Sequence, residues 1–178
     1  MEALEVLLLL LSMRPRVTKS FAHSIIYFYC ILSGDDYGFV SQYFHPYSPD
    51  LQDAMDTAQA LSFAIDCSCS GRRELKLNRD GFVIIDYTKV KKELEATRAG
   101  AILKKILSSQ EATGLDEDDI TTAAKITKLY VDILTRCNQI PPSNVLGMKT
   151  LAVAPEERLK KVGKFFDELR SHKEVACA

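Results

Sequence analysis

Apolar residues recur at helical spacing along most of this chain. Two N-terminal runs, residues 2–13 and Val17 to Leu32, are apolar on nearly every side. A helix of that kind is typical of the centre of a fold, where all of its faces are covered. Each run is shorter than the roughly 20 apolar residues of a membrane span, so we expect two buried core helices. A targeting or membrane element at residues 2–13 is the alternative.

Four further segments carry apolar residues on one face only, which predicts amphipathic helices packed on the core. They run from Asp50 to about Cys67, from Tyr87 to Leu107, from Leu115 to Arg136 and from Pro155 to about His172. Carboxylates at Asp116 to Asp119 crowd the first turn of the third of these, where they meet the positive end of the helix dipole. Tyr130 falls on the stripe of that helix that we expect to face the core.

One stretch in the middle of the chain departs from helical spacing. Leu75 and Leu77 alternate with charged residues, Asn78 to Gly81 has turn composition, and Phe82 to Ile85 follows as an apolar run. Such a pattern predicts a β-hairpin. We therefore expect one α+β domain over residues 1–178, predominantly helical, with about six helices, a central hairpin and a loop at 141–154. An all-α bundle is the alternative.

Charge and cysteine content narrow the function classes. The 178 residues include 23 Lys and Arg against 24 Asp and Glu, a net charge of −1, whereas a duplex-binding domain is typically basic. Five cysteines form an odd set without the spacing of a disulfide framework, which indicates a reducing compartment. The sequence therefore favours a soluble intracellular, cytoplasmic protein, with a protein partner or self-association rather than nucleic acid or membrane.

The sequence shows little that would support catalysis. It lacks the glycine-rich loops that bind phosphates and the common hydrolase and metalloprotease motifs. Cys67 and Cys69 form a single C-x-C, while a zinc site needs two sets of paired ligands, so we expect neither a metal nor a cofactor. His45, in a loop between tyrosines, is the best candidate for an enzyme of unknown class. The sequence favours a protein that is not an enzyme.

The last predicted helix is the strongest candidate for partner binding. Its apolar residues fall at the anchor spacing of a helix that lies in a hydrophobic groove. The side chains predicted to contact a partner are Leu159, Val162, Phe165, Phe166 and Leu169. We therefore expect a non-catalytic interaction or adaptor domain that binds a partner protein, or a second copy, through an amphipathic helix. Closure of the chain's own core by the same helix is the alternative.

The stretch from Ala60 to Val83 is similar to the N-terminal, winged-helix lobe of tRNA 2′-phosphotransferases, in its Ala-Leu-Ser-Phe and Leu-Asn-Arg-Asp-Gly-Phe-Val segments. Arg136-Cys-Asn-Gln139 resembles part of that family's NAD-site pattern. The family's Arg-His pair is replaced by Asp66-Cys67 and its Gly-His-Ser is missing, which implies lost catalysis. The resemblance implies an alternative function, an RNA-contacting winged-helix-like domain. Its contacts would be Arg72, Arg73, Lys76 and Arg79.

Overall fold

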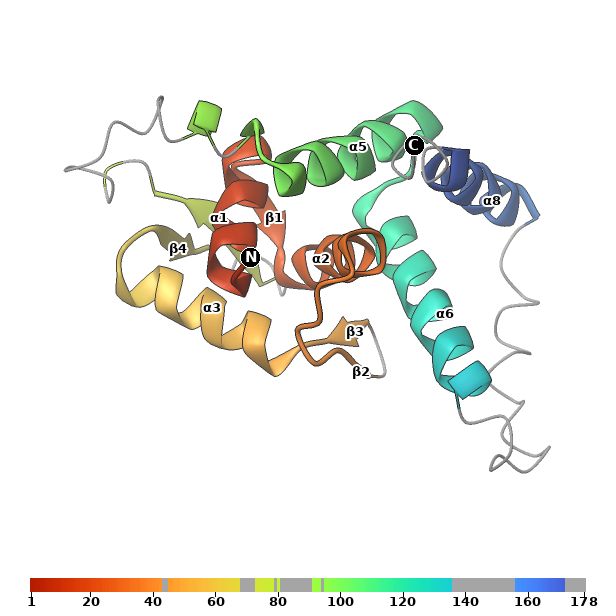
Figure 1. Cartoon of the computed structure of the whole chain (residues 1–178), viewed down its shortest axis with the longest axis horizontal. Coiled ribbons are helices and arrows are strands. Elements are labelled where there is room, and N and C mark those ends of the chain that lie inside the picture. Colours follow the sequence, from red (N-terminus) through yellow and green to blue (C-terminus); the bar gives the residue numbers. More distant parts are fainter. Residues whose placement is uncertain are drawn as a thin grey trace.

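The chain folds into a predominantly helical α+β arrangement, as the sequence predicts (Figure 1). This computed structural model describes residues 1–42, 45–67, 73–78, 80, 91–93, 95–135 and 156–171. Helices make up most of the body, and a small three-stranded sheet lies at one side.

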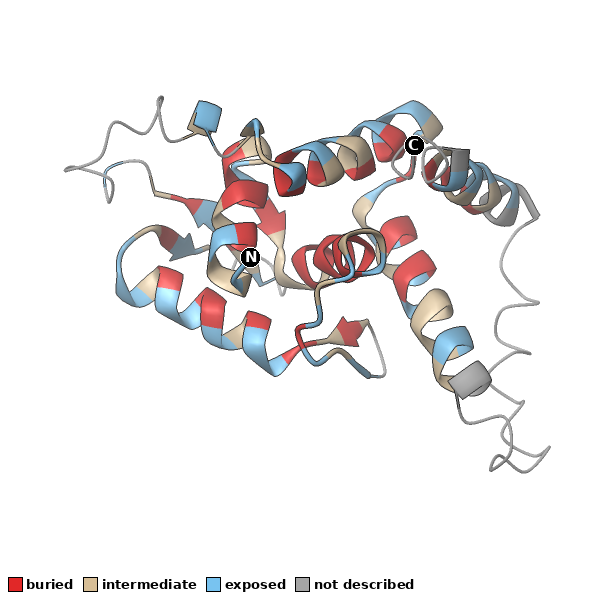
Figure 2. Ribbon diagram, viewed as in Figure 1, coloured by how far each residue is buried: buried red, intermediate tan, exposed pale blue. Residues whose placement is uncertain are grey.

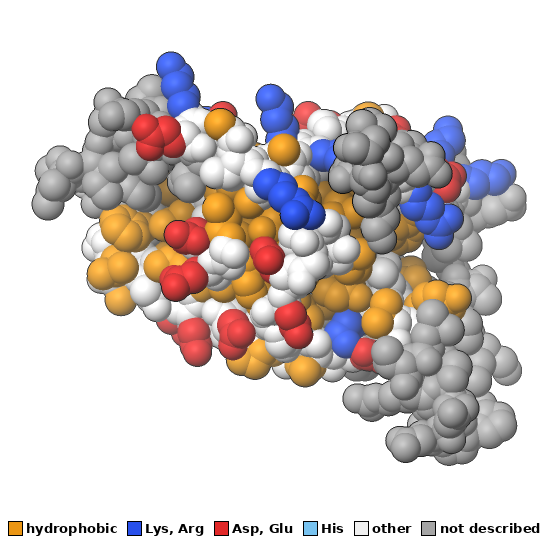
Figure 3. All heavy atoms as spheres, in the orientation of Figure 1, with side chains coloured by type: hydrophobic (Ala, Val, Ile, Leu, Met, Phe, Trp, Pro, Cys, Tyr) orange, Lys and Arg blue, Asp and Glu red, His pale blue; other side chains and the backbone are white. Residues whose placement is uncertain are grey.

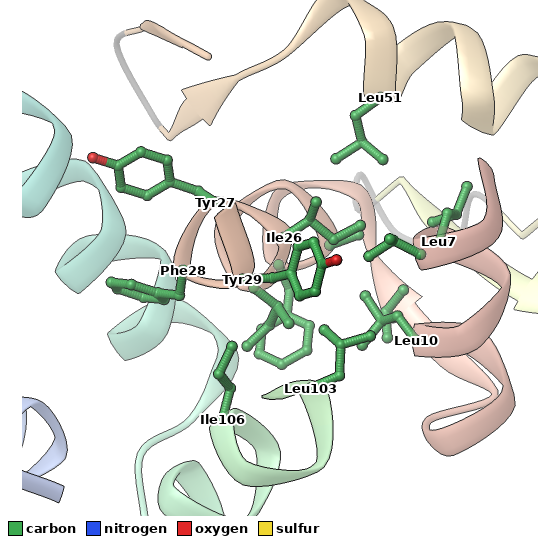
Figure 4. Packing of buried hydrophobic residues seen from close by; sticks show 14 of the residues in the cluster. Leu7, Leu10, Ile26, Tyr27, Phe28, Tyr29, Leu51, Leu103 and Ile106 are labelled. Carbon is green, nitrogen blue, oxygen red and sulfur yellow. The ribbon is translucent and has the colours of Figure 1, made fainter. Parts of the chain in front are cut away.

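Helix α2 (Lys19–Ser33) is the centre of the core. Every residue from Phe21 to Cys30 is buried, so the all-round apolar pattern of this segment is confirmed (Figure 2). Its side chains meet Leu7 and Leu10 of α1 on one side and Leu103 of α5 on another (Figure 4). A helix buried on all faces needs a cover on each, and the remaining helices supply it.

Four helices surround α2, three of them in direct contact with it and the fourth behind α1. They are α1 (Ala3–Met13), α3 (Pro49–Ala60), α5 (Arg98–Thr113) and α6 (Glu117–Thr135). Helices α1, α5 and α6 pack directly on α2, and α3 packs on α1. The predicted burial of the N-terminal run is confirmed, because Val6, Leu7 and Leu9 to Leu11 are fully buried.

Short polar signals set the ends of these helices. The side chains of Thr18, Ser48 and Thr97 accept hydrogen bonds from backbone N–H groups in the first turns of α2, α3 and α5. At the other end, Gly34 and Gly114 adopt the left-handed conformation, with φ of 84° and 64°. Glycine takes that conformation without steric cost, so α2 and α5 end there.

The side chain of Arg14 contacts residues of three helices, α2, α5 and α6. It follows α1, and its guanidinium donates to Gln110 of α5 at 3.2 Å and to Glu117 of α6 at 2.8 Å. The same group lies 4.5 Å from the centre of the Phe21 ring of α2, a cation–π contact. Glu117 also accepts from the hydroxyl of Thr18 at 2.8 Å, which fixes the start of α6 beside β1.

The sheet is antiparallel and has the order β1-β5-β4. Its strands are β1 (Arg16–Thr18), β4 (Ala64–Asp66) and β5 (Glu74–Leu77). Val17 and Leu75 lie opposite each other and are buried, whereas Arg16 and Lys76 form an opposed pair on the solvent face. A second, two-stranded sheet is made by β2 (Val40–Ser41) and β3 (Pro46–Tyr47), between α2 and α3.

With β2 and β3 set aside, the order α1, β1, α2, α3, β4, β5, with β5 between β1 and β4, resembles the connectivity of a winged helix. In a winged helix the helix that precedes the hairpin is at the recognition position, and the hairpin connection is the wing; α3 and the β4–β5 connection have the corresponding places in this order. One departure is the connection between α2 and α3. It runs from Gly34 to Ser48 and includes β2 and β3, whereas a helix-turn-helix has a turn of three or four residues.

Three elements differ from the sequence prediction. The helix expected from Asp50 to about Cys67 ends at Ala60, because the chain turns at Ser62, with φ of 60°, and continues as β4. The helix expected from Tyr87 to Leu107 has other bounds, because Thr97 caps the start of α5 and the helix continues to Thr113. The predicted hairpin pairs Leu75 and Leu77 with Phe82 to Ile85, whereas β5 forms a hairpin with the preceding strand β4. The opposite edge of β5 pairs with β1, so both edges of Glu74–Leu77 are occupied. The predicted returning strand, Phe82 to Ile85, and the loop at 141–154 lie outside the described residues.

Helix α8 (Glu156–Ser171) closes one side of the core. Phe165 is fully buried, and its ring centre lies 5.5 Å from that of Phe28 in an edge-to-face arrangement. Phe166 is partly buried and lies 6.0 Å from Phe28. Val162 and Leu169 are also buried. Among the described helices, α8 included, none has the length and apolar character needed to cross a membrane.

Replacement of Phe165 by alanine should lower the free energy of unfolding by roughly 3–5 kcal/mol, because it removes a fully buried ring from the contact with Phe28. Urea denaturation measures this change. The matched control is Asp167→Ala, two residues along the same helix and exposed, which should alter the free energy by less than about 0.5 kcal/mol. Equal effects of the two substitutions would contradict the placement of α8 in the core.

Candidate functional site

The predicted partner-binding face of the last helix is occupied inside the chain itself. Val162, Phe165 and Leu169 are at most 9% exposed, and Phe166 packs on the core beside them. In this arrangement these side chains contact α2 and its neighbours and are not displayed to a partner. The side chain of Leu159 lies outside the described residues. A partner protein would therefore bind to a surface other than this face of α8.

Three of the exposed apolar residues in the described part of the chain lie where α6 meets β2. We call this region the α6–β2 surface and define it by Val40, Tyr130 and Val131, which are 48%, 55% and 39% exposed. The hydroxyl of Ser41, next to Val40, donates to the carboxylate of Asp132, next to Val131. This hydrogen bond joins the strand and the helix at the surface, so the three apolar residues lie on adjoining elements.

A small hollow of about 50 Å³ lies between the same two elements. Pro46 and Leu129 contribute apolar parts of its lining, and Lys125 and Lys128 line it as well. Lys128 forms an ion pair with Asp132 one turn further along α6. The hollow is too small for a cofactor, because ligand sites are typically several hundred Å³. It has room for one small apolar side chain of a partner.

The exposure of Tyr130 corrects the prediction that it faces the core. Ile120, Ala123 and Ala124, in the first half of α6, are buried, whereas Tyr130 is more than half exposed. Figure 2 shows this change from buried to exposed along α6, and Figure 1 shows that its second half extends past α2. Helical periodicity gives the direction in which a residue faces, but it does not show where the covering core ends.

His45, the candidate catalytic residue, lies in a stack of rings. The ring centres of His45 and Tyr47 each lie 5.1 Å from that of His23. Nδ1 of His45 lies 2.8 Å from the carbonyl oxygen of Pro46, an arrangement in which the ring donates its proton to that carbonyl. Within the described residues, no serine, threonine or cysteine forms a hydrogen bond with His45, and no group of side chains is suited to hold a metal ion. The arrangement gives His45 a packing role.

His23 has a structural role at the start of α3. Nδ1 of His23 accepts a hydrogen bond from the backbone N–H of Ser48 at 3.3 Å, and Ser48 caps α3. Because Nδ1 is the acceptor, the folded state requires an unprotonated nitrogen there. Burial, the charge of nearby His45 and that of Lys19 together lower the pKa of His23 from 6.5 to about 3.

The cations of the RNA-binding alternative are only partly described. Arg73 and Lys76 are exposed, Arg73 in the β4–β5 connection and Lys76 on the solvent face of the sheet. Arg72 and Arg79 lie outside the described residues. Arg16, opposite Lys76, forms an ion pair with Glu74 at 2.5 Å, which reduces the positive charge of this face.

Helix α3, at the recognition position, is acidic. Asp50, Asp53 and Asp56 are exposed along it, and the helix contains no lysine or arginine. Within the described part of the chain, no cation forms an ion pair with any of the three. Figure 3 shows several carboxylates over the position of α3. The field at this helix is therefore negative.

Comparison with known proteins finds no family model, no curated protein and no solved structure that matches the chain.

Lowering the pH from 6.5 to about 3 should destabilise the fold through His23. In this interval the unfolded state binds a proton that the folded state excludes, so the free energy of unfolding falls by up to about 1.4 kcal/mol per pH unit. Urea denaturation across this range measures the slope. The control is His23→Asn, whose amide oxygen preserves an acceptor near the position of Nδ1 without titrating. Parallel pH profiles of the two proteins would contradict the role of His23.

Proposed function

We propose that this protein is a non-catalytic interaction or adaptor domain, to which a partner protein docks at the α6–β2 surface. The observation that supports this most is the exposure of Tyr130 and Val131 on α6 and of Val40 on β2, two elements that the Ser41–Asp132 hydrogen bond joins. Single exposed apolar residues are ordinary, but several on adjoining elements beside a hollow are typical of a binding surface. The proposal retains an amphipathic helix as the binding element and replaces α8 by α6.

The chemistry of the surface defines the partner. Tyr130 is an aromatic anchor of the kind that carries much of the energy at protein interfaces. The hollow beside it admits one small apolar side chain. The expected partner therefore presents a small apolar residue to the hollow and an apolar surface to Tyr130.

The site is best tested by replacing Tyr130 with a photoreactive aromatic amino acid and irradiating the full chain in its native cells. A protein adduct is expected from position 130 and not from Thr122, an exposed residue two turns earlier on α6. The captured protein is then purified. Its affinity for the Tyr130→Asp and Val131→Asp variants should fall at least about 30-fold, the loss expected at the centre of an interface.

The matched control is Thr122→Asp, which should leave the affinity unchanged. Because Tyr130 is 55% exposed, Tyr130→Asp should also preserve the thermal unfolding transition. A captured protein that binds all three variants equally would contradict the proposed surface. A self-association that is lost with Tyr130→Asp, measured by sedimentation equilibrium, would identify a second copy as the partner.

The second candidate function is the RNA-contacting winged-helix-like domain. The connectivity of the fold favours it, as do the exposed Arg73 and Lys76. The charge of α3 opposes it, because Asp50, Asp53 and Asp56 would meet the phosphates of a nucleic acid at the recognition position. Contact would then be limited to the wing and the sheet face.

Binding of a structured RNA should accordingly be weaker than the roughly 10⁻⁴–10⁻⁶ M of ordinary non-specific complexes at physiological salt. Fluorescence anisotropy in 50 and 200 mM salt measures this affinity. Any binding through the wing should fall steeply with salt and should weaken further in Lys76→Glu. Micromolar affinity at the higher salt concentration, reduced by Lys76→Glu, would favour the RNA-binding function over the protein-binding one.

A further inference from the structure

A cavity lies between the end of α2 and the start of α5, on a part of the molecule distinct from the α6–β2 surface. Its volume is about 230 Å³. Ser33, the last residue of α2, and Asp35, two residues further on, line one part of the wall. Arg98, the first residue of α5, lines another part, and Ala99 and Ile102 supply an apolar surface.

Arg98 and Asp35 line this cavity without forming an ion pair with each other, whereas Asp35 forms one with the ammonium of Met1, which also lines the cavity. The guanidinium of Arg98 makes no hydrogen bond or ion pair within the described residues, although Asp35 lines the same cavity. One carboxylate oxygen of Asp35, Oδ2, accepts from the hydroxyl of Tyr29 at 2.6 Å and lies 3.8 Å from the ammonium of Met1. The other, Oδ1, is left without a hydrogen bond in the described part of the chain.

The geometry points to a binding site for a free α-amino acid. An amino acid carries an ammonium and a carboxylate on one carbon, which is complementary to a carboxylate and a guanidinium that share a small cavity. Its ammonium would donate to Oδ1 of Asp35, and its carboxylate would accept from Arg98. A guanidinium binds a carboxylate through two parallel hydrogen bonds, which favours Arg98 as the anchor.

The surroundings fit this ligand in charge and size. The carboxylate would lie near the first turn of α5, where the helix dipole is positive. Ala99 and Ile102 would contact the side chain of the amino acid. The tyrosine hydroxyl holds the Asp35 carboxylate in place, because Tyr29 is itself buried in the core. A cavity of about 230 Å³ is below the usual range for larger ligands and has the size expected for a single amino acid.

Isothermal titration calorimetry on the full chain tests this site. The probes are glycine, L-alanine, L-serine, L-leucine, L-glutamate and L-lysine, which vary the side chain and retain the zwitterion. At least one should bind with a Kd below about 10 mM. For L-leucine the matched analogues are 4-methylpentanoate, which lacks the ammonium, and 3-methylbutylamine, which lacks the carboxylate. Each analogue should bind at least tenfold more weakly than the amino acid.

Two substitutions and a control complete the experiment. Arg98→Gln and Asp35→Asn should each weaken binding at least tenfold. Asn retains an oxygen that accepts from Tyr29, and Arg98 is exposed, so both variants should keep the unfolding transition of the parent protein. Lys104→Gln removes an exposed cation further along α5 and should leave the affinity unchanged.

Three results would overturn the assignment. The first is the absence of saturable binding for all six amino acids. The second is equal affinity for 4-methylpentanoate and L-leucine, which would indicate an anion site without recognition of the ammonium. The third is unchanged amino-acid affinity in Arg98→Gln. None of these results affects the proposal for the α6–β2 surface, because the two sites share no residues.

Discussion

The burial of α2 is the constraint on which the rest of the structure depends. A helix that is buried continuously from Phe21 to Cys30 cannot be stable alone in water, and it needs apolar surfaces on all sides. Helices α1, α5 and α6 supply three of them, and α8 adds the Phe165 contact to Phe28. The arrangement of elements distant in sequence therefore follows from one apolar segment near the N-terminus.

Burying this helix also requires that its polar groups find partners. His23, Ser24 and Tyr29 lie within the buried stretch, and each forms a hydrogen bond. The partner of His23 is the backbone of Ser48, and that of Tyr29 is Asp35. These bonds fix the position of the start of α3 and of Asp35, which lines the cavity between the end of α2 and the start of α5. The polar residues of α2 thus determine positions that the apolar packing leaves open.

Much of the fold could be predicted from the sequence because its signals are local. The all-round apolar pattern predicted the central helix, the carboxylates at Asp116 to Asp119 predicted the start of α6, and Pro155 predicted the start of α8. The ending of α3 at Ala60 and the pairing of β5 with β1 depend on contacts between distant segments, and the periodicity of apolar residues carries no information about such contacts.

The candidate sites could not be predicted for the same reason. Tyr130 is exposed because the core ends before it, and Arg98 and Asp35 line one cavity only after the chain has folded.

Helix α6 is joined to other elements near both of its ends. The carboxylate of Glu117 holds the N-terminal end through Arg14 and Thr18, and Asp132, near the other end, accepts a hydrogen bond from Ser41 of β2. Tyr130 lies 13 residues from Glu117, or about 20 Å along the axis at 1.5 Å per residue. The exposed apolar part of α6 is therefore held in place by β2, about 20 Å from the contacts that fix the start of the same helix.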